Sequence, residues 1–410
     1  GVSGYDGPLT NVSKWSREDI ISSASAVIDK DGNIFIVSDD GNLYCINTQG
    51  KVVWYFNSRS KIISTPVIGP NGNIFFQNWE NSTLYEIKTN GSLVWKYELG
   101  EFNTGAGVKI GDDGTVYAIS GNDDKSTLFA FKDHKLFWSL DLPASLDSTP
   151  AIGPDGSIYV VCKNHHLACI NWDGTLKGYI YLDREDWIYG DRYNLIEYYV
   201  SASVDSDGTV YVLNLPVGQL VHGEQLYSKA VAAYYPNGTL KWSNKIGIVY
   251  GTPSIANGKV YIVGSNKLYA FDIETGDLLW SNDICNASYS ASAPLVSSNG
   301  IVYLAHNNTV YAFGDDGAEI WSYVLTGQYD NPIALSGPAI SNDGTLIVTT
   351  TQGIYVFNDI SADFTWEHKN GTVRSIQFTD LSIEGDNTYS WDFGDYRPNM
   401  RGRSSRRLWS

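Results

Sequence analysis

Short runs in which apolar and polar residues alternate recur along the chain, and Asn-Gly or Asp-Gly pairs separate many of them. Alternation with a period of two is typical of β-strands that bury one face, and an Asn-Gly or Asp-Gly pair between two such runs indicates a hairpin with a type I′ turn. We expect a hairpin between two strands, A and B, at each of eight pairs: Asp31-Gly32, Asn71-Gly72, Asp113-Gly114, Asp155-Gly156, Asp207-Gly208, Asn257-Gly258, Asn299-Gly300 and Asp343-Gly344.

A second series of turns, out of phase with the first, is followed by a short strand D that ends in tryptophan. A further strand, C, lies between the two series, as in Leu268-Tyr269-Ala270-Phe271. Each unit of about 42 residues therefore predicts a meander of four strands, and four-stranded sheets repeated around an axis form a β-propeller. In the fourth unit Gly178 stands where the tryptophan is expected. The blade tryptophans are Trp15, Trp54, Trp95, Trp138, Trp242, Trp280 and Trp321.

The eighth unit contains strands A, B and C but no strand D that ends in tryptophan. The missing strand is expected at the other end of the chain, in residues 11–15, because Trp15 precedes Trp54 by 39 residues, close to the repeat length. We therefore predict an all-β, eight-bladed propeller over residues 1–359, in which the N-terminal strand completes the last blade. Such closure removes the open edge that an incomplete ring would expose.

The chain has 410 residues, 43% of them hydrophobic, and a formal net charge of −17. This hydrophobic content supports a packed core and excludes a wholly disordered chain. The acidic balance disfavours nucleic acids and anionic membranes as partners, because both attract basic surfaces. No run of about 18 apolar residues occurs, so we expect no membrane-spanning helix. Because the only Met is Met400, we expect that a segment such as a signal peptide preceded residue 1.

The units resemble PQQ-like, or quinoprotein-type, propeller repeats over about residues 10–359. The resemblance lies in the Gly-x-x-x-Trp close, in the third strand and in openings such as Ser64-Thr65-Pro66 and Ser148-Thr149-Pro150. It implies the propeller fold, and quinoprotein dehydrogenases of this fold hold PQQ and Ca²⁺ in an axial funnel. Their adjacent cysteine pair is missing here, and no calcium-ligating set is recognisable. We therefore expect neither PQQ nor calcium as a cofactor.

Residues 360–395 resemble the first half of a PKD domain, an immunoglobulin-like β-sandwich that is common on cell surfaces. The most specific string is Trp391-Asp392-Phe393-Gly394-Asp395. The later strands of such a domain are absent. Residues 396–410 instead carry five arginines and no acid, and we expect them to belong to neither fold. The combination of propeller and PKD segment resembles archaeal surface proteins, especially those of methanogens.

No catalytic constellation is recognisable. The six histidines include no pair with i, i+4 spacing, and no Cys–His metal pattern, Gly-x-Ser-x-Gly string or P-loop occurs. We therefore predict no metal site and no enzymatic activity. A tight turn at His165-His166 would place Cys162 opposite Cys169. Burial of the two as small hydrophobic residues is the favoured interpretation, and a disulfide is the alternative.

Seven Asn-x-Ser/Thr sequons, expected in turns and loops, are candidate glycosylation sites. They begin at Asn11, Asn81, Asn90, Asn237, Asn286, Asn307 and Asn370.

The longest irregular segments are expected on one face of the ring, which carries the B–C loops and the connections between blades. Residues 183–199 connect units four and five, and residues 214–228 form a long B–C loop in unit five. Aromatic side chains and arginine dominate binding hot spots. We therefore predict a ligand patch in the first segment; the alternative is that its aromatic residues pack inward around Gly178. The patch consists of Trp187, Tyr189, Arg192 and Tyr193.

These features predict a non-enzymatic extracellular or cell-surface protein of the adhesion or surface-layer type, whose propeller is an interaction platform for a protein or glycan partner. One alternative is a PQQ- and calcium-dependent quinoprotein dehydrogenase. Another is an envelope assembly scaffold similar to the outer-membrane assembly propellers, against which the PKD-like segment argues.

Overall fold

The computed structural model describes most of the chain. The described residues are 1–100, 106–122, 125–142, 148–162, 166–182, 201–213, 219–221, 224–226, 231–246, 249–264, 266–284, 292–327, 333–334, 336–359, 364–368 and 376–380.

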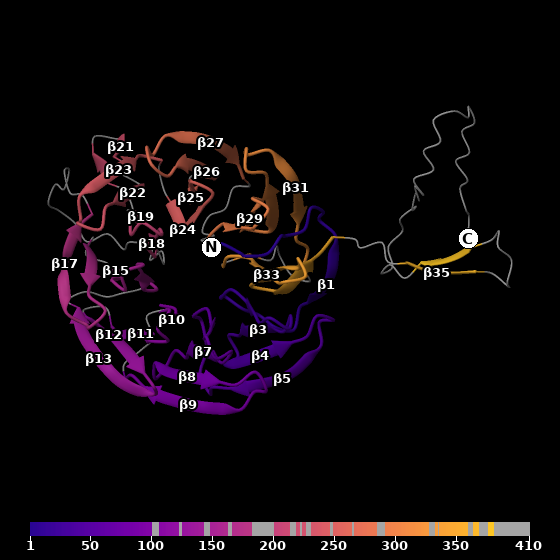
Figure 1. The fold of residues 1–410 in the computed structure, drawn as a ribbon, viewed down its shortest axis with the longest axis horizontal. Helices are drawn as coiled ribbons and strands as arrows, with labels where there is room; N and C mark the ends of the chain where they lie inside the picture. Colours follow the sequence, from indigo (N-terminus) through magenta and orange to yellow (C-terminus); the bar gives the residue numbers. More distant parts are fainter. Residues whose placement is uncertain are drawn as a thin grey trace. The chain divides into compact units, whose positions relative to one another are not determined.

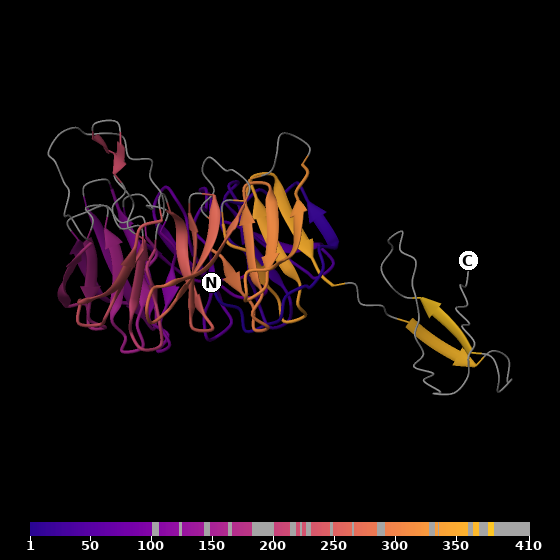
Figure 2. The same cartoon turned by 90° about the horizontal axis from the view of Figure 1, so that it is seen from above.

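The described strands of residues 1–359 form eight four-stranded antiparallel sheets around a central axis, and each sheet is one blade of a β-propeller (Figure 1). Strands A to D follow one another from the axis to the rim. Figure 2 shows the ring edge on, with the strands crossing its thickness. The expected all-β, eight-bladed propeller is therefore confirmed.

The first four blades follow the chain in order. They contain β2 (Val27–Ile28), β3 (Ile34–Val37), β4 (Asn42–Ile46) and β5 (Val52–Asn57); β6 (Val67–Ile68), β7 (Ile74–Gln77), β8 (Thr83–Ile87) and β9 (Leu93–Glu98); β10 (Lys109–Ile110), β11 (Val116–Gly121), β12 (Ser126–Lys132) and β13 (Lys135–Leu142); and β14 (Ala151–Ile152), β15 (Ile158–Cys162), β16 (His166–Ile170) and β17 (Leu176–Tyr181).

The remaining blades include one insertion and one strand from the N-terminus. Blade 5 contains β18 (Ser203–Val204), β19 (Val210–Leu213), β22 (Val231–Tyr234) and β23 (Leu240–Asn244), and the hairpin of β20 (Gln219–Val221) and β21 (Glu224–Leu226) interrupts its B–C loop. Blades 6 and 7 contain β24 (Val249–Ala256), β25 (Lys259–Gly264), β26 (Lys267–Asp272) and β27 (Leu278–Asp283), then β28 (Leu295–Val296), β29 (Val302–His306), β30 (Thr309–Phe313) and β31 (Glu319–Val324). Blade 8 combines β32 (Ala339–Ile340), β33 (Leu346–Thr350) and β34 (Gly353–Phe357) with β1 (Ser13–Arg17).

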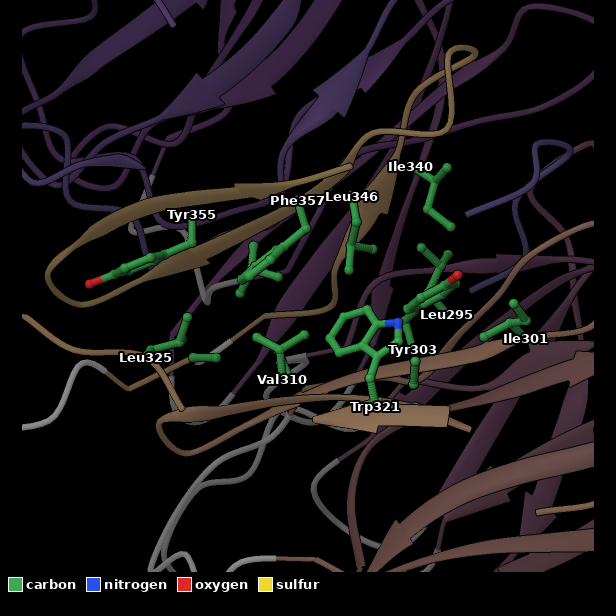
Figure 3. Close-up of a cluster of buried hydrophobic side chains, with 14 residues drawn as sticks. Leu295, Ile301, Tyr303, Val310, Trp321, Leu325, Ile340, Leu346, Tyr355 and Phe357 are labelled. Atoms are coloured by element: carbon green, nitrogen blue, oxygen red, sulfur yellow. The ribbon is translucent and has the colours of Figure 1, made fainter. Parts of the chain in front are cut away.

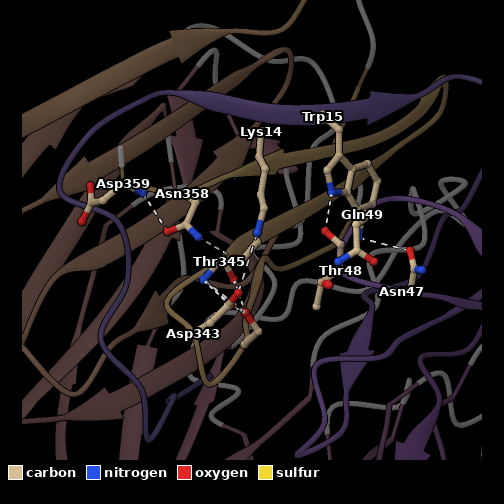
Figure 4. A network of polar contacts seen from close by, with 10 residues as sticks. Lys14, Trp15, Asn47, Thr48, Gln49, Asp343, Thr345, Asn358 and Asp359 are labelled. Atoms are coloured by element: carbon tan, nitrogen blue, oxygen red, sulfur yellow. Dashed lines mark hydrogen bonds and ion pairs between the residues drawn. The ribbon is translucent and has the colours of Figure 1, made fainter. Parts of the chain in front are cut away.

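The N-terminal strand closes the ring as the spacing of Trp15 predicts. β1 pairs antiparallel with β34, and Trp15 stands opposite Val356. Figure 4 shows the closure: Lys14 Nζ lies 3.7 Å from Asp343 Oδ2, and Trp15 Nε1 donates to the Thr48 carbonyl of blade 1 at 3.1 Å. The last blade thus takes three strands from one end of the propeller chain and the fourth from the other.

The residues before β1 run from the axis of the ring to its rim. The N-terminus lies near the axis (Figure 1), where Ser3 N donates to the Val296 carbonyl at 2.7 Å. Further along, the Pro8 carbonyl accepts the Tyr303 hydroxyl at 2.9 Å, and Thr10 N donates to Asp359 Oδ1 at 2.9 Å. Residues 8–12 therefore take the place of the C–D turn that blade 8 lacks.

The turns between strands A and B differ from the expected type I′. Only Asn257-Gly258, among the eight pairs, has positive φ at both positions, 52° and 71°. The other seven form a longer loop, illustrated by Gly32 N donating to the Asp29 carbonyl and Asp29 N donating to the Asn33 carbonyl. This pattern is a type I turn followed by a left-handed glycine, which needs one positive φ instead of two. The Asn/Asp-Gly pairs do mark hairpins, but the turn type was wrong for seven of them.

Hydroxyl groups at the start of the innermost strands, in and around the Ser/Thr-Pro openings, join neighbouring blades. Thr149 Oγ1 accepts Gly107 N at 2.8 Å, and Thr149 N donates to Ser201 Oγ at 2.9 Å. Ser203 Oγ donates to the Pro253 carbonyl at 2.6 Å, and Ser254 Oγ to the Pro294 carbonyl at 2.5 Å. The opening motif therefore supplies polar links between blades near the axis.

The core lies between the blades, because each blade covers a face of the next. The B and C strands are consequently buried on both faces; β29, β30, β33 and β34 are buried along their whole length. Figure 3 shows the cluster that joins Val310 and Trp321 of blade 7 to Leu346 and Phe357 of blade 8.

The chain divides into two compact units, Gly1–Asp359 and Ile360–Ser410. In the second unit, β35 (Phe364–His368) pairs antiparallel with β36 (Ile376–Asp380). The Trp391–Asp395 string of the PKD resemblance and the basic residues 396–410 lie outside the described residues.

Replacing Trp15 by Ala should lower the free energy of unfolding by about 2–4 kcal/mol, because the half-buried indole joins blade 8 to blade 1. Urea denaturation of the propeller measures this loss. The matched control is Trp172→Ala, which removes a mostly exposed indole and should change the stability by less than about 0.5 kcal/mol. Equal losses in the two variants would contradict closure through β1.

Candidate interaction surface

Six blade tryptophans bind the next blade in the same way. Each donates its indole N–H to a backbone carbonyl of the C–D turn of the next blade, over 2.9–3.1 Å. The pairs are Trp15 with Thr48, Trp54 with Thr89, Trp138 with Trp172, Trp242 with Ile273, Trp280 with Asp315 and Trp321 with Pro8. Trp95 differs, because its ring stacks on His134 with centroids 5.6 Å apart.

A glycine lies under the indole ring in five of these seams, the boundaries between neighbouring blades. Gly50, Gly91, Gly174, Gly276 and Gly317 all have φ between 75° and 87°. A Cβ atom at any of them would lie 2.5–2.9 Å from an atom of the tryptophan ring. We call the turn glycine, together with the carbonyl that accepts the indole N–H, a tryptophan seat. The Gly-x-x-x-Trp spacing thus reflects contacts with two different neighbours: the glycine seats the tryptophan of the preceding blade.

Gly276→Ala should destabilise the propeller more than an alanine substitution at a glycine with the same left-handed backbone but no neighbouring ring. Gly114 has a similar φ of 79°, but a Cβ there meets no atom within 4 Å. Gly114→Ala should therefore cost about 1–2 kcal/mol for the left-handed backbone alone. Gly276→Ala should cost about 1–3 kcal/mol more, because its Cβ would lie 2.6 Å from the Trp242 ring. Chemical denaturation measures both; equal costs would contradict the seat.

The seam between blades 4 and 5 departs from this pattern. Gly178 stands opposite Cys169, as Trp54 stands opposite Cys45, so the prediction that Gly178 replaces a blade tryptophan is confirmed. Ile180, two residues further along β17, lies over Gly238 of blade 5 instead. This seam therefore has a seat without its tryptophan.

The adjacent seam, between blades 3 and 4, carries an exposed aromatic pair. Trp172 is 60% exposed and Phe137 is 47% exposed, and their rings stack with centroids 6.5 Å apart at 19°. The backbone carbonyl of Trp172 accepts the indole N–H of Trp138, as the carbonyls of Thr48 and Thr89 accept those of other blade tryptophans. Its ring is thus not required by the seat. Seams 3/4 and 4/5 together form the candidate interaction surface.

The seam between blades 2 and 3 contains a buried carboxylate that sequence reasoning missed. Glu86 is 1% exposed; its Oε1 accepts Asn71 Nδ2 at 3.1 Å and Asn73 Nδ2 at 2.6 Å. Its Oε2 lies 2.6 Å from Nε2 of His134, whose ring stacks on Trp95. The sequence could have indicated this site, because Glu86 occupies the strand position that Cys45 occupies in blade 1. The cluster links blades 2 and 3 structurally, because its polar side chains contact one another.

The cysteines that raised the disulfide alternative are free and buried. The strand register places Cys162 opposite His166 and Cys169 opposite Tyr159, so the two cysteines do not face one another. Cys162 pairs with a residue three positions before Cys169, so the hairpin turns earlier than a Cys162–Cys169 pairing needs, and the disulfide alternative was wrong. Burial raises the pKa of Cys162 to about 12 and that of Cys45 and Cys169 to about 11, which keeps the thiols protonated and unreactive.

His306, at the end of β29, makes stability depend on pH. Burial lowers its pKa to about 4, whereas the ordinary value is 6.5. Between these values the unfolded chain binds more protons than the folded one, so stability is complete above about pH 6.5 and falls as the pH drops toward 4.

We expect the unfolding free energy of the protein to fall by about 3 kcal/mol through this group between pH 6.5 and 4. His306→Gln should remove that part of the pH dependence. Urea denaturation at several pH values, with both proteins compared at each, separates the contribution of His306 from that of the acidic side chains. Parallel pH profiles would contradict the assignment.

The predicted patch of Trp187, Tyr189, Arg192 and Tyr193 lies outside the described residues, as do two of the sequon asparagines, Asn286 and Asn370. Asn90 and Asn237 are exposed in C–D turns, and the exposed Asn81 lies in a B–C loop. Asn11 Nδ2 donates to the Ser322 carbonyl at 3.1 Å, and Asn307 is half-buried with a φ of 52°. Among the sequon asparagines that the structure describes, Asn11, Asn81, Asn90 and Asn237 are therefore exposed.

Within the described ranges, no three His, Cys, Asp or Glu side chains gather in a way that could hold a metal ion. No described helix is long and apolar enough to cross a membrane.

A protein-family model described as outer membrane protein assembly factor BamB matches residues 11–95, 80–228 and 227–384. The chain belongs to this family. The crystal structure of BamB from Moraxella catarrhalis has the same fold, with a TM-score of 0.63 and 15% identity, over 85% of this chain and 98% of that one. BamB of Yersinia pestis is 23% identical over 267 residues, which are 62% of this chain and 65% of that protein.

Other relatives of this BamB-like propeller have different names. Tetrathionate hydrolase of Acidithiobacillus ferrooxidans is 23% identical over 71% of this chain, and Protein GAMETE EXPRESSED 3 of Arabidopsis thaliana is 22% identical over 75%. The chain spans about half the length of these two relatives, 51% and 48%. A streptogramin B lyase structure shares the fold, with a TM-score of 0.50 and 15% identity, over 84% of this chain and 95% of that one. Enzymes and an assembly factor therefore share this architecture.

Proposed function

We propose that this BamB-like propeller is a non-enzymatic protein-binding scaffold of the cell envelope or cell surface. The observation that carries the proposal is the exposed, stacked aromatic pair of Phe137 and Trp172. Family membership supports an interaction or assembly role, because BamB is named as an assembly factor.

The aromatic pair has the composition of a binding hot spot. Tryptophan and other large aromatic side chains contribute much of the free energy of protein interfaces when a partner removes them from water. Leu136, next to Phe137 in β13, and Leu176, at the start of β17, are both 42% exposed. A protein partner of mixed apolar and polar character fits this surface better than a nucleic acid, given the net charge of −17.

The titratable groups of the described interior support a scaffold over an enzyme. The buried thiols have pKa values raised far above neutrality, and the pKa of His306 is lowered to about 4. General acid–base catalysis needs groups that titrate near the working pH. A quinoprotein dehydrogenase is the second candidate, on the family resemblance of the repeats alone.

More specifically, we propose that the scaffold is an extracellular protein of the adhesion or surface-layer type. In this proposal a PKD-like segment follows the propeller, as in archaeal surface proteins. It is supported by the sequence resemblance of residues 360–395 and by the exposed sequons at Asn90 and Asn237. We assign the partner as a protein, and a glycan is the alternative.

The test is site-specific photo-crosslinking in an envelope preparation of the source organism. With p-benzoylphenylalanine at position 136, we expect a discrete protein adduct, identified by mass spectrometry, that Phe137→Ala with Trp172→Ala weakens at least tenfold. The matched control is Leu278→Ala with Leu279→Ala, which removes exposed apolar side chains from blade 6 and should leave the adduct unchanged. Equal adduct yields in both double variants would overturn the proposal. A rise in melting temperature that requires both PQQ and Ca²⁺ would favour the dehydrogenase.

A further inference from the structure

Residues 1–12, which we call the clasp, lie along blade 7 and bind it largely through their backbone. Ser3 N donates to the Val296 carbonyl at 2.7 Å, next to a parallel bridge between the two segments. The Tyr5 carbonyl accepts Ser298 N at 3.1 Å. An extended peptide adds to the edge of a sheet in the same way. The clasp is thus bound as a peptide ligand would be.

The middle of the clasp fits blade 7 through a specific sequence, Asp6-Gly7-Pro8. Asp6 Oδ1 accepts Ser298 Oγ at 2.6 Å. A Cβ atom on Gly7 would lie 2.5 Å from the Tyr303 ring, so a larger residue does not fit there. The Pro8 carbonyl accepts the Tyr303 hydroxyl at 2.9 Å and the indole N–H of the tryptophan of blade 7 at 3.1 Å. Blade 7 therefore carries a groove that selects an Asp-Gly-Pro segment.

The apolar side chains of the clasp are turned toward water. Val2, Tyr5, Leu9 and Val12 are 61%, 44%, 57% and 37% exposed, whereas the Gly-Pro pair between them is buried. Segments with few buried apolar contacts open locally at a lower free energy than the whole fold. We therefore expect the clasp to leave its groove without unfolding of the blades.

The clasp and β1 bind different blades. Apart from the bonds of Thr10 and Val12 with residues 358–359, the hydrogen bonds that residues 2–12 make to other described segments go to blade 7, whereas β1 belongs to blade 8. The two are joined where the register of β1 shifts, just after Ser13. Fully extended, twelve residues span at most about 40 Å, so a released clasp reaches an adjoining molecule.

We propose that the clasp also binds the blade 7 groove of a second copy of this chain, so that two copies exchange their clasps. Each groove keeps its hydrogen bonds in the exchange, because the incoming segment is identical to the outgoing one. The two copies meet over the grooves, where the outward side chains of Val2, Tyr5 and Leu9 lie between them. The second copy thus covers the apolar side chains that closure within one chain leaves exposed.

The concentration of the protein decides between closure and exchange. Within one chain the clasp meets its own groove at an effective concentration on the order of 1 mM. Exchange therefore competes where copies are crowded to similar concentrations, as on a shared surface. The groove lies four seams around the ring from the stacked pair of Phe137 and Trp172, so a partner bound there does not occupy it.

The test is a disulfide that forms between positions 6 and 298 of two different chains. All chains carry Cys285→Ser, which removes the cysteine outside the described residues. Chains with Asp6→Cys are mixed at about 1 mM with chains that carry Ser298→Cys, and the mixture is oxidised with diamide. We expect a linked dimer on a non-reducing gel, with the link mapped by mass spectrometry. The matched control is Ser206→Cys, an exposed serine at the same turn position of blade 5, which should give at least tenfold less dimer.

Two glycines of the clasp separate exchange from chance encounters. Gly7→Ala, added to the Asp6→Cys chain, should lower the yield of linked dimer at least tenfold, because its Cβ meets the Tyr303 ring. Gly4→Ala should leave the yield unchanged, because a Cβ there meets no atom within 4 Å.

Equal dimer yields with the cysteine at 206 and at 298, or equal effects of the two glycine substitutions, would overturn the proposal. So would a chain carrying both Asp6→Cys and Ser298→Cys that stays wholly monomeric when oxidised at the same concentration, because the clasp would then bind only its own groove. A photo-crosslinked adduct at position 136 tests a different side of the ring, so the scaffold function and the exchange fail separately.

Discussion

The contact between an indole ring and a turn glycine of the next blade is the interaction on which the ring depends. Each four-stranded blade exposes apolar faces that only its neighbours can cover, so the blades must be held at a fixed distance. The left-handed glycine lets the ring approach the backbone closely, and the carbonyl nearby satisfies the indole N–H. Because the same contact recurs at seam after seam, the geometry of one blade determines that of the next.

Closure of the ring follows from the same contact. Blade 8 has no continuous C–D turn, yet the tryptophan of blade 7, Trp321, still requires an acceptor. Residues 8–12 supply it through the Pro8 carbonyl before the chain continues into β1, which then presents Trp15 to blade 1. One segment therefore completes two seams, and the ends of the propeller chain are held together by contacts that the repeat already uses.

Departures from the repeat are where the molecule differs from a uniform ring. At seam 2/3 a contact between the side chains of Glu86 and His134 crosses the seam in place of the usual indole bond. Seams 3/4 and 4/5 depart in other ways. Trp172 exposes a ring that its turn does not use, and Gly178 replaces a blade tryptophan, so that Ile180 lies over Gly238 instead. Neither change follows the contact that the other seams use.

The sequence by itself determined the number of blades, their strand order and the closing role of Trp15. These follow from hairpins of adjacent residues and from a spacing that repeats, so local signals suffice. The missing tryptophan at Gly178 was visible for the same reason. The sequence resemblance also indicated the PQQ-like family to which the matched residues 11–384 belong.

Only the tertiary structure decided what each seam contains. Three contacts join residues of different blades: Phe137 stacks on Trp172, Glu86 contacts His134, and Ile180 lies over Gly238. The register that separates Cys162 from Cys169, and the turn type at seven of the Asn/Asp-Gly pairs, depend on which backbone groups meet across a hairpin. Spacing cannot predict such contacts, because they are set by how two folded sheets pack against each other.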